Sequence, residues 1–121
     1  MPMPRNMSFA MTTSQFRMRT KDVTRRFGWW FLNSGDVLCG VEKAMGLKKG
    51  EKINRLGLIE VVSTRAEPLN AITYDDVIRE GFPDYTPEDF ITMLVSHYRV
   101  SPQAEVNRIE YRYLSKQTET L

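Results

Sequence analysis

The order of apolar and polar residues along the chain predicts strands first, then helices, then one more strand. Two runs rich in apolar and β-branched residues, 36–43 and 58–64, predict strands. Weaker signals predict a first strand at 7–13, a short helix or turn at 13–19, and a strand or extended loop at 21–27. The stretch between the two strong strands is rich in lysine and glycine and predicts a protruding loop or hairpin.

Two helices are predicted in the middle of the chain by their capping residues. Thr73 is a good N-cap, acidic residues follow it in the first turn, and Gly81 suits the position after the helix end. Thr86 caps a second helix, Pro87 occupies its first position, and Pro102 follows its end. The apolar residues of the second helix recur at helical spacing and form one stripe, which contains Phe90, Ile91, Leu94, Val95 and Tyr98.

The segment 106–114 alternates and predicts a last strand with one face toward solvent. Its apolar face holds Ile109, Tyr111 and Tyr113, and its polar face holds Arg108, Glu110 and Arg112. Strands grouped apart from helices are typical of α+β proteins, and closing the sheet would remove its edges. We therefore expect an α+β fold, with a β-barrel of about five to six strands and two or three short helices packed alongside.

The composition is that of an ordinary folded domain, with 121 residues of which 41% are hydrophobic and 26% are charged. We expect a single domain over 1–121, with a core at about 7–114 and frayed termini at 1–6 and 115–121. No apolar run approaches the roughly 18 residues of a membrane span, and the first residues lack the apolar core of a secretory signal. These features predict a cytoplasmic protein that does not bind membranes.

The chain has one cysteine, Cys39, and one histidine, His97. A disulfide within the chain is therefore excluded, and a zinc site made of cysteine and histidine would need three or four such ligands. We expect no metal and no cofactor, and we expect Cys39 to be a small buried group in a strand.

Charge is distributed unevenly along the chain. Residues 1–66 hold 12 lysines and arginines against 5 acids, and residues 67–121 hold 5 against 10. This asymmetry predicts a basic surface contributed by the first half, which would attract polyanions. The alternative is that the two halves pair with each other and their charges cancel.

The stretch 20–30 (TKDVTRRFGWW) gathers cationic, hydroxyl and aromatic side chains. Arg25 and Arg26 are adjacent on a predicted strand and point to opposite faces, so that one can bind a phosphate while the other pairs with an internal acid. Trp29 and Trp30 are candidates either for the core or for stacking on a base. If they continue a strand, only one of them can face the core.

Three further groups are candidates for chemistry. Lys21 could deprotonate the Thr24 hydroxyl if burial or cationic neighbours lower the lysine pKa. Glu80 stands at a helix end, where the dipole disfavours an acid, so it is expected to have a partner, to act as a functional carboxylate, or to be solvated. The loop that carries Lys48, Lys49 and Lys52 would attract phosphate, although it lacks a Walker motif.

Several segments in this order resemble the ASCH domain family, which is related in fold to PUA domains. The resemblance spans about 7–114 and rests on three signals: TKDVTRR at 20–26, the Gly-Asp turn at 35–36, and Glu-Gly-Phe at 80–82. It is nearest to the small single-domain ASCH proteins of bacteria and their phages. Where the family commonly has Gly-Arg-Lys-Thr, this chain has Arg-Thr-Lys-Asp at 19–22, and Asp22 would favour the protonated form of the lysine.

The resemblance implies a PUA-like β-barrel with a cleft lined by the Lys-Thr-Arg segment and Glu80. The family is considered RNA-binding by analogy with PUA domains. One branch is an amidohydrolase that removes the acetyl group from the exocyclic amine of acetylcytidine. There a lysine is the base, a threonine the nucleophile and a glutamate the proton donor, and the matching positions in this chain are Lys21, Thr24 and Glu80.

Our first hypothesis is a module that binds RNA or a nucleotide in a basic cleft, since unpaired bases can stack on aromatic side chains. The residues expected to contact nucleic acid are Arg19, Arg25, Arg26, Trp29, Trp30, Lys48, Lys49 and Lys52. The alternatives are an amidohydrolase with a Lys21, Thr24 and Glu80 site, and a module that binds another protein. The oligomeric state and the identity of the base stay open.

Overall fold

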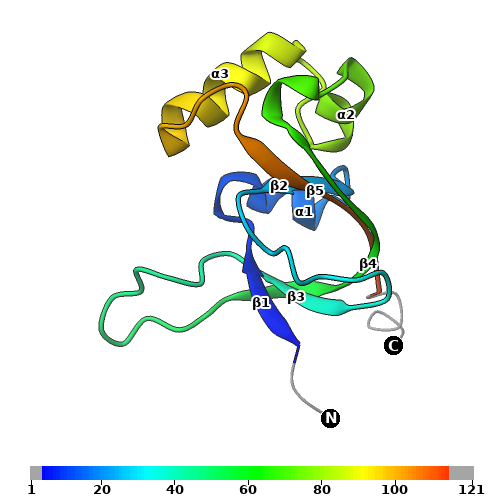
Figure 1. The fold of residues 1–121 in the computed structure, drawn as a ribbon. Helices are drawn as coiled ribbons and strands as arrows, with labels where there is room; N and C mark the ends of the chain where they lie inside the picture. Colours follow the sequence, from blue (N-terminus) through cyan, green and yellow to red (C-terminus); the bar gives the residue numbers. More distant parts are fainter. Residues whose placement is uncertain (1–3, 115–121) are drawn as a thin grey trace.

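The computed structural model of the chain describes residues 4–114. They form one curled sheet with short helices at one end and inside the curve (Figure 1). The strands are β1 (Arg5–Ser8), β2 (Val23–Arg26), β3 (Val37–Val41), β4 (Arg55–Pro68) and β5 (Glu105–Tyr113). The helices are α1 (Thr13–Arg17), α2 (Tyr74–Arg79) and α3 (Pro87–Tyr98), with 3-10 turns η1 (Ala10–Thr12) and η2 (Leu69–Ala71).

The sheet is mixed and runs in the order β1-β3-β4-β5-β2. β1 pairs with β3 in parallel, and the other three pairings are antiparallel. Among the described residues the two edge strands, β1 and β2, do not pair with each other, so the sheet is a half-barrel. The α+β prediction is confirmed, with five strands and three short α-helices, and the barrel is open.

Two clusters of buried side chains hold the domain together. The first fills the curve of the sheet and consists of Met7, Phe9, Phe16, Leu32, Leu38, Ile59, Val61, Ile109 and Tyr111. The second lies under α2 and α3 and consists of Leu69, Ile72, Val77, Phe90, Leu94 and Val106. α1 packs closely against β3, where a Cβ at Gly40 would lie only 2.5 Å from the Phe16 ring. Only glycine allows this contact.

The predicted helix starts are confirmed by their caps. The Thr73 hydroxyl accepts a hydrogen bond from the Asp76 amide at 3.2 Å. Thr86 and Asp89 form a capping box, in which each side chain accepts a hydrogen bond from the other residue's amide. α3 ends at Tyr98, followed by Arg99 in the left-handed conformation. These helices begin where the sequence predicts because their starting signals are local.

The first strand differs from the expectation. Arg5 and Asn6, assigned to a frayed terminus, pair with Leu38 and Cys39 of β3. The strand stops before Ala10, where a 3-10 turn begins instead of continuing to residue 13. The rest of the termini expected to fray, 1–3 and 115–121, lies outside the described residues. Cys39 is buried in β3, as predicted.

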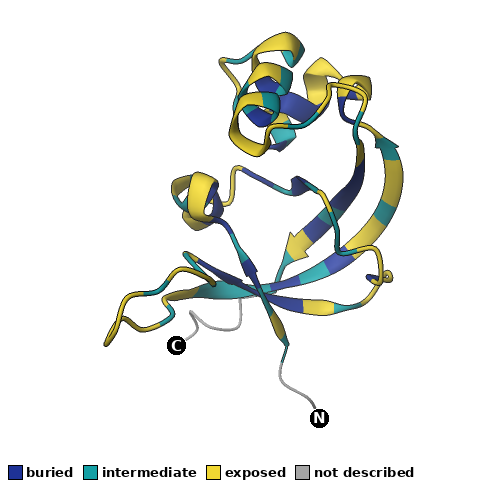
Figure 2. Cartoon of the chain, turned by 60° about the vertical axis from the view of Figure 1, so that its left-hand side comes forward, coloured by how far each residue is buried: buried dark blue, intermediate teal, exposed yellow. Residues whose placement is uncertain are grey.

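β4 is longer than the predicted 58–64, because β5 pairs along most of it, from Ile59 to Pro68. The loop between β3 and β4 protrudes from the sheet and is exposed along most of its length (Figure 2). Within residues 4–114, no helix is long and apolar enough to cross a membrane. The same part of the chain holds no cluster of three or more potential metal-ligating side chains.

Candidate functional site

A pocket of about 270 Å³ opens between β2, η1 and α3. It brings together Lys21, Thr24, Arg25, Arg26 and Glu80, which come from two segments more than fifty residues apart. The remaining lining consists of Ser8, Phe9, Ala10, Met11, Thr12, Phe82, Phe90, Met93, Leu94, His97 and Tyr98. The three residues predicted as catalytic therefore line one pocket.

Lys21 and Glu80 form a buried ion pair at the floor of the pocket. The Lys21 Nζ lies 2.6 Å from Glu80 Oε1 and also donates to the Glu80 carbonyl at 3.0 Å. Both side chains are 3% exposed. Burial lowers the pKa of Lys21 below its ordinary value, and the adjacent Glu80 carboxylate opposes this shift. Of the alternatives left open for the acid at this helix end, the structure excludes a solvated side chain and gives Glu80 a partner.

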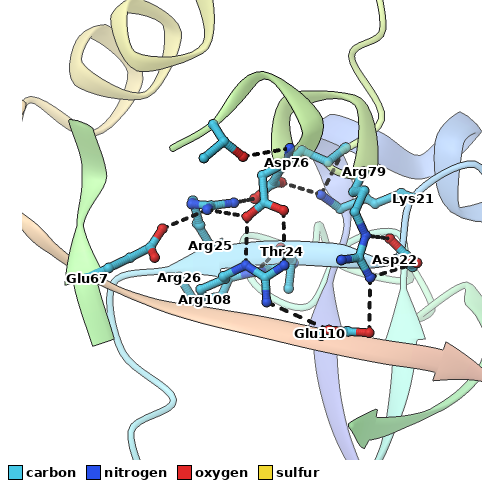
Figure 3. A network of polar contacts seen from close by, with 12 residues as sticks. Lys21, Asp22, Thr24, Arg25, Arg26, Glu67, Asp76, Arg79, Arg108 and Glu110 are labelled. Atoms are coloured by element: carbon cyan, nitrogen blue, oxygen red, sulfur yellow. Dashed lines mark hydrogen bonds and ion pairs between the residues drawn. The ribbon is translucent and has the colours of Figure 1, made fainter. Parts of the chain in front are cut away.

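Arg25 lies behind this pair and is enclosed by three carboxylates (Figure 3). Its terminal nitrogens bond Glu80 Oε2 at 3.2 Å, Asp76 Oδ2 at 2.6 Å and Glu67 Oε2 at 2.7 Å. Its Nε is buried without a hydrogen-bond partner in the described part of the chain. With its charge compensated on three sides, Arg25 stabilises the floor of the pocket and presents little charge to a ligand.

Asp76 is the centre of this network. It accepts bonds from Arg108 at 2.6 and 3.0 Å in addition to the bond from Arg25. Arg25 and Arg108 stand directly opposite each other on β2 and β5, an arrangement of like charges that is unfavourable unless an acid bridges them. Hydrogen bonds from Arg108 and then Arg25 hold the pKa of Asp76 well below its usual range, against the opposing effect of burial.

Our prediction that Arg108 faces solvent is wrong. Only 6% of the residue is exposed, because α2 covers this part of β5 and places Asp76 on the guanidinium. Strand alternation assigns residues to two faces but does not say what covers either face. Nothing in the sequence indicates that Asp76 belongs to a buried network, because an acid in the first turn of a helix is already explained by the helix dipole.

Arg25 and Arg26 point to opposite faces of β2, as their spacing predicts, and they have opposite environments. The Arg26 Nε donates to Thr24 Oγ1 at 2.9 Å, and its guanidinium lies 4.8 Å from the centre of the Phe9 ring. Among the described residues no carboxylate lies within 4.0 Å of Arg26. Burial lowers the pKa of Arg26, yet an arginine keeps its charge at neutral pH.

The opposite wall of the pocket is mostly apolar and comes from α3 and the turn before it. The residues are Phe82, Phe90, Met93, Leu94, His97 and Tyr98. The sequence predicts an apolar stripe on α3 but does not say what the stripe contacts. The stripe is shared with the pocket: Tyr98 is an exposed member of it, and Met93 and His97 beside it are half-exposed and exposed. A pocket with one polar and one apolar wall suits a planar organic ligand.

The other predicted contact residues lie outside this pocket. Arg19 lines a separate depression, with its guanidinium 5.2 Å from the Tyr113 ring centre. Lys52 lines another, on the protruding loop that also carries Lys48 and Lys49. The cationic side chains expected around one cleft are therefore distributed over three places.

The two tryptophans, which were candidates for the core or for stacking on a base, do not line the pocket. β2 ends at Arg26, and Trp29 adopts a left-handed conformation with φ 61°, which takes the chain away from the pocket. Trp29 packs against the first core cluster, whereas Trp30 is 52% exposed.

Asp22 does not contact Lys21 as the sequence suggested. Its carboxylate accepts hydrogen bonds from Arg79 at 3.0 and 3.2 Å. The partner of Lys21 is Glu80, which the chain places on the inner side while Asp22 faces outward.

No family model matches the chain, and no curated protein matches it. Among solved structures, the chain is similar to the crystal structure of protein EF3133 from Enterococcus faecalis V583, a DUF984 protein. The TM-score is 0.65 at 14% identity, and the match covers 98% of this chain and 82% of that chain. This similarity supports the α+β fold and carries no information about ligands.

Proposed function

We propose that this chain is an ASCH-type domain that binds a nucleotide, either free or within single-stranded RNA, in the pocket of Lys21 and Glu80. The observation that carries the proposal is Arg26, a charged pocket residue without a carboxylate partner among the described residues. It stands across from an apolar wall that a base can pack against.

The size of the pocket favours one nucleotide over a folded RNA surface. At about 270 Å³ the pocket lies near the lower end of the range of small-molecule sites. A base can enter such a pocket only when it is unpaired, which selects single strands and free nucleotides. The Arg26 guanidinium would bind the phosphate or a base carbonyl, because its planar fork matches both kinds of oxygen.

Binding can be tested with the four ribonucleoside monophosphates and short single-stranded RNAs by isothermal titration calorimetry. Arg26→Gln is expected to weaken binding about tenfold or more, since a hydrogen bond to a charged group is worth roughly 1.5–3 kcal/mol. Arg17→Gln, at an exposed position of α1 outside the pocket, is the matched control. Absence of binding at low salt, or equal affinities of both variants, would contradict the proposal.

Amide hydrolysis is a second candidate, favoured by the buried lysine beside a threonine in one pocket. The Lys21–Glu80 pair can share one proton, and in its neutral form Lys21 is a base and Glu80 an acid. Thr24 Oγ1 would attack an acyl carbonyl as Lys21 takes its proton. The C–N bond would then break as Glu80 protonates the leaving amine, and water would release the acyl group from the threonine.

Incubation with acetylcytidine tests this candidate, with cytidine followed by chromatography. Lys21→Met and Thr24→Val are expected to abolish turnover, whereas Thr24→Ser retains a hydroxyl and part of the activity. Thr20→Val, at an exposed position in the same segment, is expected to behave as the wild type. If nucleotides bind but no cytidine forms, binding alone is the function.

A further inference from the structure

We propose that Asp22 and Arg79 form a clasp that positions Lys21 against Glu80 from outside the pocket. Only one of its two tests, the measurement of nucleotide binding, rests on the proposed function. Asp22 follows Lys21 and Arg79 precedes Glu80 in the chain, so the two ion pairs are neighbours along the same two segments. Lys21 and Glu80 line the pocket, whereas Asp22 and Arg79 line a separate depression. Figure 3 shows the ion pair between Asp22 and Arg79.

Besides the bond between the Lys21 and Glu80 side chains, four hydrogen bonds tie the two segments together. The Asp22 amide donates to the Arg79 carbonyl at 3.0 Å. The Arg79 guanidinium donates to both carboxylate oxygens of Asp22, at 3.0 and 3.2 Å. On the inner side, Lys21 Nζ donates to the Glu80 carbonyl at 3.0 Å. The Lys21–Glu80 side-chain pair is therefore the inner half of a two-sided connection.

The connection is anchored on β5. Arg79 also lies 3.0 Å from Glu110 Oε2, and the Asp22 carbonyl accepts from the Tyr111 amide at 3.0 Å. The hydroxyls of Tyr111 and Tyr113 donate to the Lys21 carbonyl at 3.0 and 2.5 Å. These contacts set the position of the Lys21 backbone relative to the sheet.

The two members of the pocket's ion pair lie just outside the ends of two different elements, so no single element fixes one relative to the other. Lys21 precedes β2, and Glu80 follows the last residue of the six-residue helix α2. The Glu80 amide donates to the Asp76 carbonyl at 2.8 Å as the C-cap of α2, and the residue after Lys21 is bonded to β5, so each backbone is held by its own element. The contacts between the two segments set how their side chains meet. A buried ion pair is favourable only when its geometry is good, so its alignment depends on what fixes the two segments.

Asp22 and Arg79 reach the pocket only through their neighbours. Neither residue lines the pocket, and both line a separate depression on the outer side of the same segments. Their side chains are 45% and 28% exposed, against 3% for Lys21 and Glu80. An effect of Asp22 or Arg79 on the ligand must therefore be transmitted through Lys21 and Glu80. Asp22 and Arg79 are thus positioning residues.

The pKa of Lys21 measures this positioning without any ligand. The charged or titratable groups around Lys21 are Glu80, Arg25 and Arg26, the hydroxyls of Tyr111 and Tyr113 at its carbonyl, and His97 across the pocket. Contact with Glu80 raises the pKa of Lys21 against the effect of burial. Loosening that contact therefore lowers the pKa further.

The experiment compares Asp22→Asn, Arg79→Gln and the double variant by NMR titration of labelled lysine, with Lys21→Arg to assign the signal. A clasp predicts that both single variants lower the pKa of Lys21, and that the double variant lowers it no further. If the two residues acted on Lys21 only through their charges, the variants would shift the pKa of Lys21 in opposite directions. Asp22→Asn removes a negative charge and would lower it, whereas Arg79→Gln removes a positive charge and would raise it. Opposite shifts, or no shift, would overturn the proposal.

Glu60→Gln is the matched control, because Glu60 and Arg112 form an exposed ion pair on β4 and β5 away from the pocket. In a second readout, both clasp variants are expected to weaken nucleoside monophosphate binding about tenfold, and Glu60→Gln is expected to leave it unchanged. If the wild type binds no nucleotide, the proposed function fails while the lysine titration still decides the clasp. Equal affinities of the clasp variants and the control would count against the clasp.

Discussion

Two regions that hold basic residues of the first half of the chain contrast with each other. At the floor of the pocket, Lys21 and Arg25 are buried and paired with Glu67, Asp76 and Glu80 of the second half. On the protruding loop, Lys48 and its neighbours are mostly exposed. The charge asymmetry between the halves thus cancels inside the fold and persists on the loop. Formal charge along a chain predicts a basic surface only where the fold does not bring acids to it.

The energetic weights of the two regions differ as well. The loop has an ion pair between Lys43 and Glu51 at 3.7 Å, with side chains 43% and 40% exposed. Such surface pairs contribute about 0–1 kcal/mol. Removal of one partner from a buried pair leaves an uncompensated charge and costs about 3–5 kcal/mol. The stability of the domain should therefore depend on the floor of the pocket and hardly on the loop.

The largest effect is expected for Asp76→Asn, which removes the carboxylate between Arg25 and Arg108. We expect a loss of about 3–5 kcal/mol in the free energy of unfolding, measured with urea and circular dichroism. Asp75→Asn is the control, because Asp75 is exposed in the same first turn of α2 and has the same relation to the helix dipole. Similar losses in the two variants would show that the helix dipole, rather than the network, is what matters.

A change of pH gives a milder version of the same test. Because the pKa of Asp76 is depressed in the folded state, its ionisation stabilises the fold above the unfolded-state pKa of about 3.9. That contribution is lost as the pH falls through this value toward the folded-state pKa. Between about pH 5 and pH 3, the free energy of unfolding should therefore fall more steeply with falling pH for the wild type than for Asp76→Asn. Parallel profiles would exclude Asp76 as a source of acid sensitivity.

The loop can be tested by replacing Lys48, Lys49 and Lys52 with glutamine together. If a single strand leaves the pocket along the loop, the slope of log affinity for RNA against log salt should become less negative by about 2. Each lost phosphate contact accounts for roughly 0.7 of this change. Binding of a nucleoside monophosphate should not change, because none of the three lysines lines the pocket. Equal losses for the monophosphate and the RNA would mean that the loop acts on the pocket itself.

Local signals in the sequence were sufficient for most of the fold. The caps of α2 and α3 and the strands β3 and β5 depend on residues within a few positions of each other. For Glu80 the helix position alone left a partner, a functional carboxylate and a solvated side chain as alternatives, and the structure selects the partner. That Lys21, Thr24 and Glu80 share a pocket, however, came from a family resemblance, because no local rule brings residues 21 and 80 together.

The remaining features of the site depend on tertiary contacts that single-sequence patterns do not encode. Arg108 was assigned to solvent because alternation does not reveal that α2 covers it. Asp22 was assigned to Lys21 because they are adjacent, but adjacent residues in extended chain point to opposite sides. Trp29 and Trp30 were both left as candidates for the core or for stacking on a base, because a left-handed residue that turns the chain could not be foreseen from a tryptophan.

The smallest effect is expected at Trp30, and it sharpens the contrast between buried and exposed members of one segment. Trp30→Ala should change the free energy of unfolding by less than about 0.5 kcal/mol, since the residue is half exposed and outside both core clusters. Trp29→Ala removes a ring packed on the core and should cost more, within about 1–3 kcal/mol. In Trp29→Phe the remaining indole should be quenched strongly by iodide, and in Trp30→Phe weakly. Equal quenching in the two variants would mean that the left-handed turn at Trp29 does not separate the two rings.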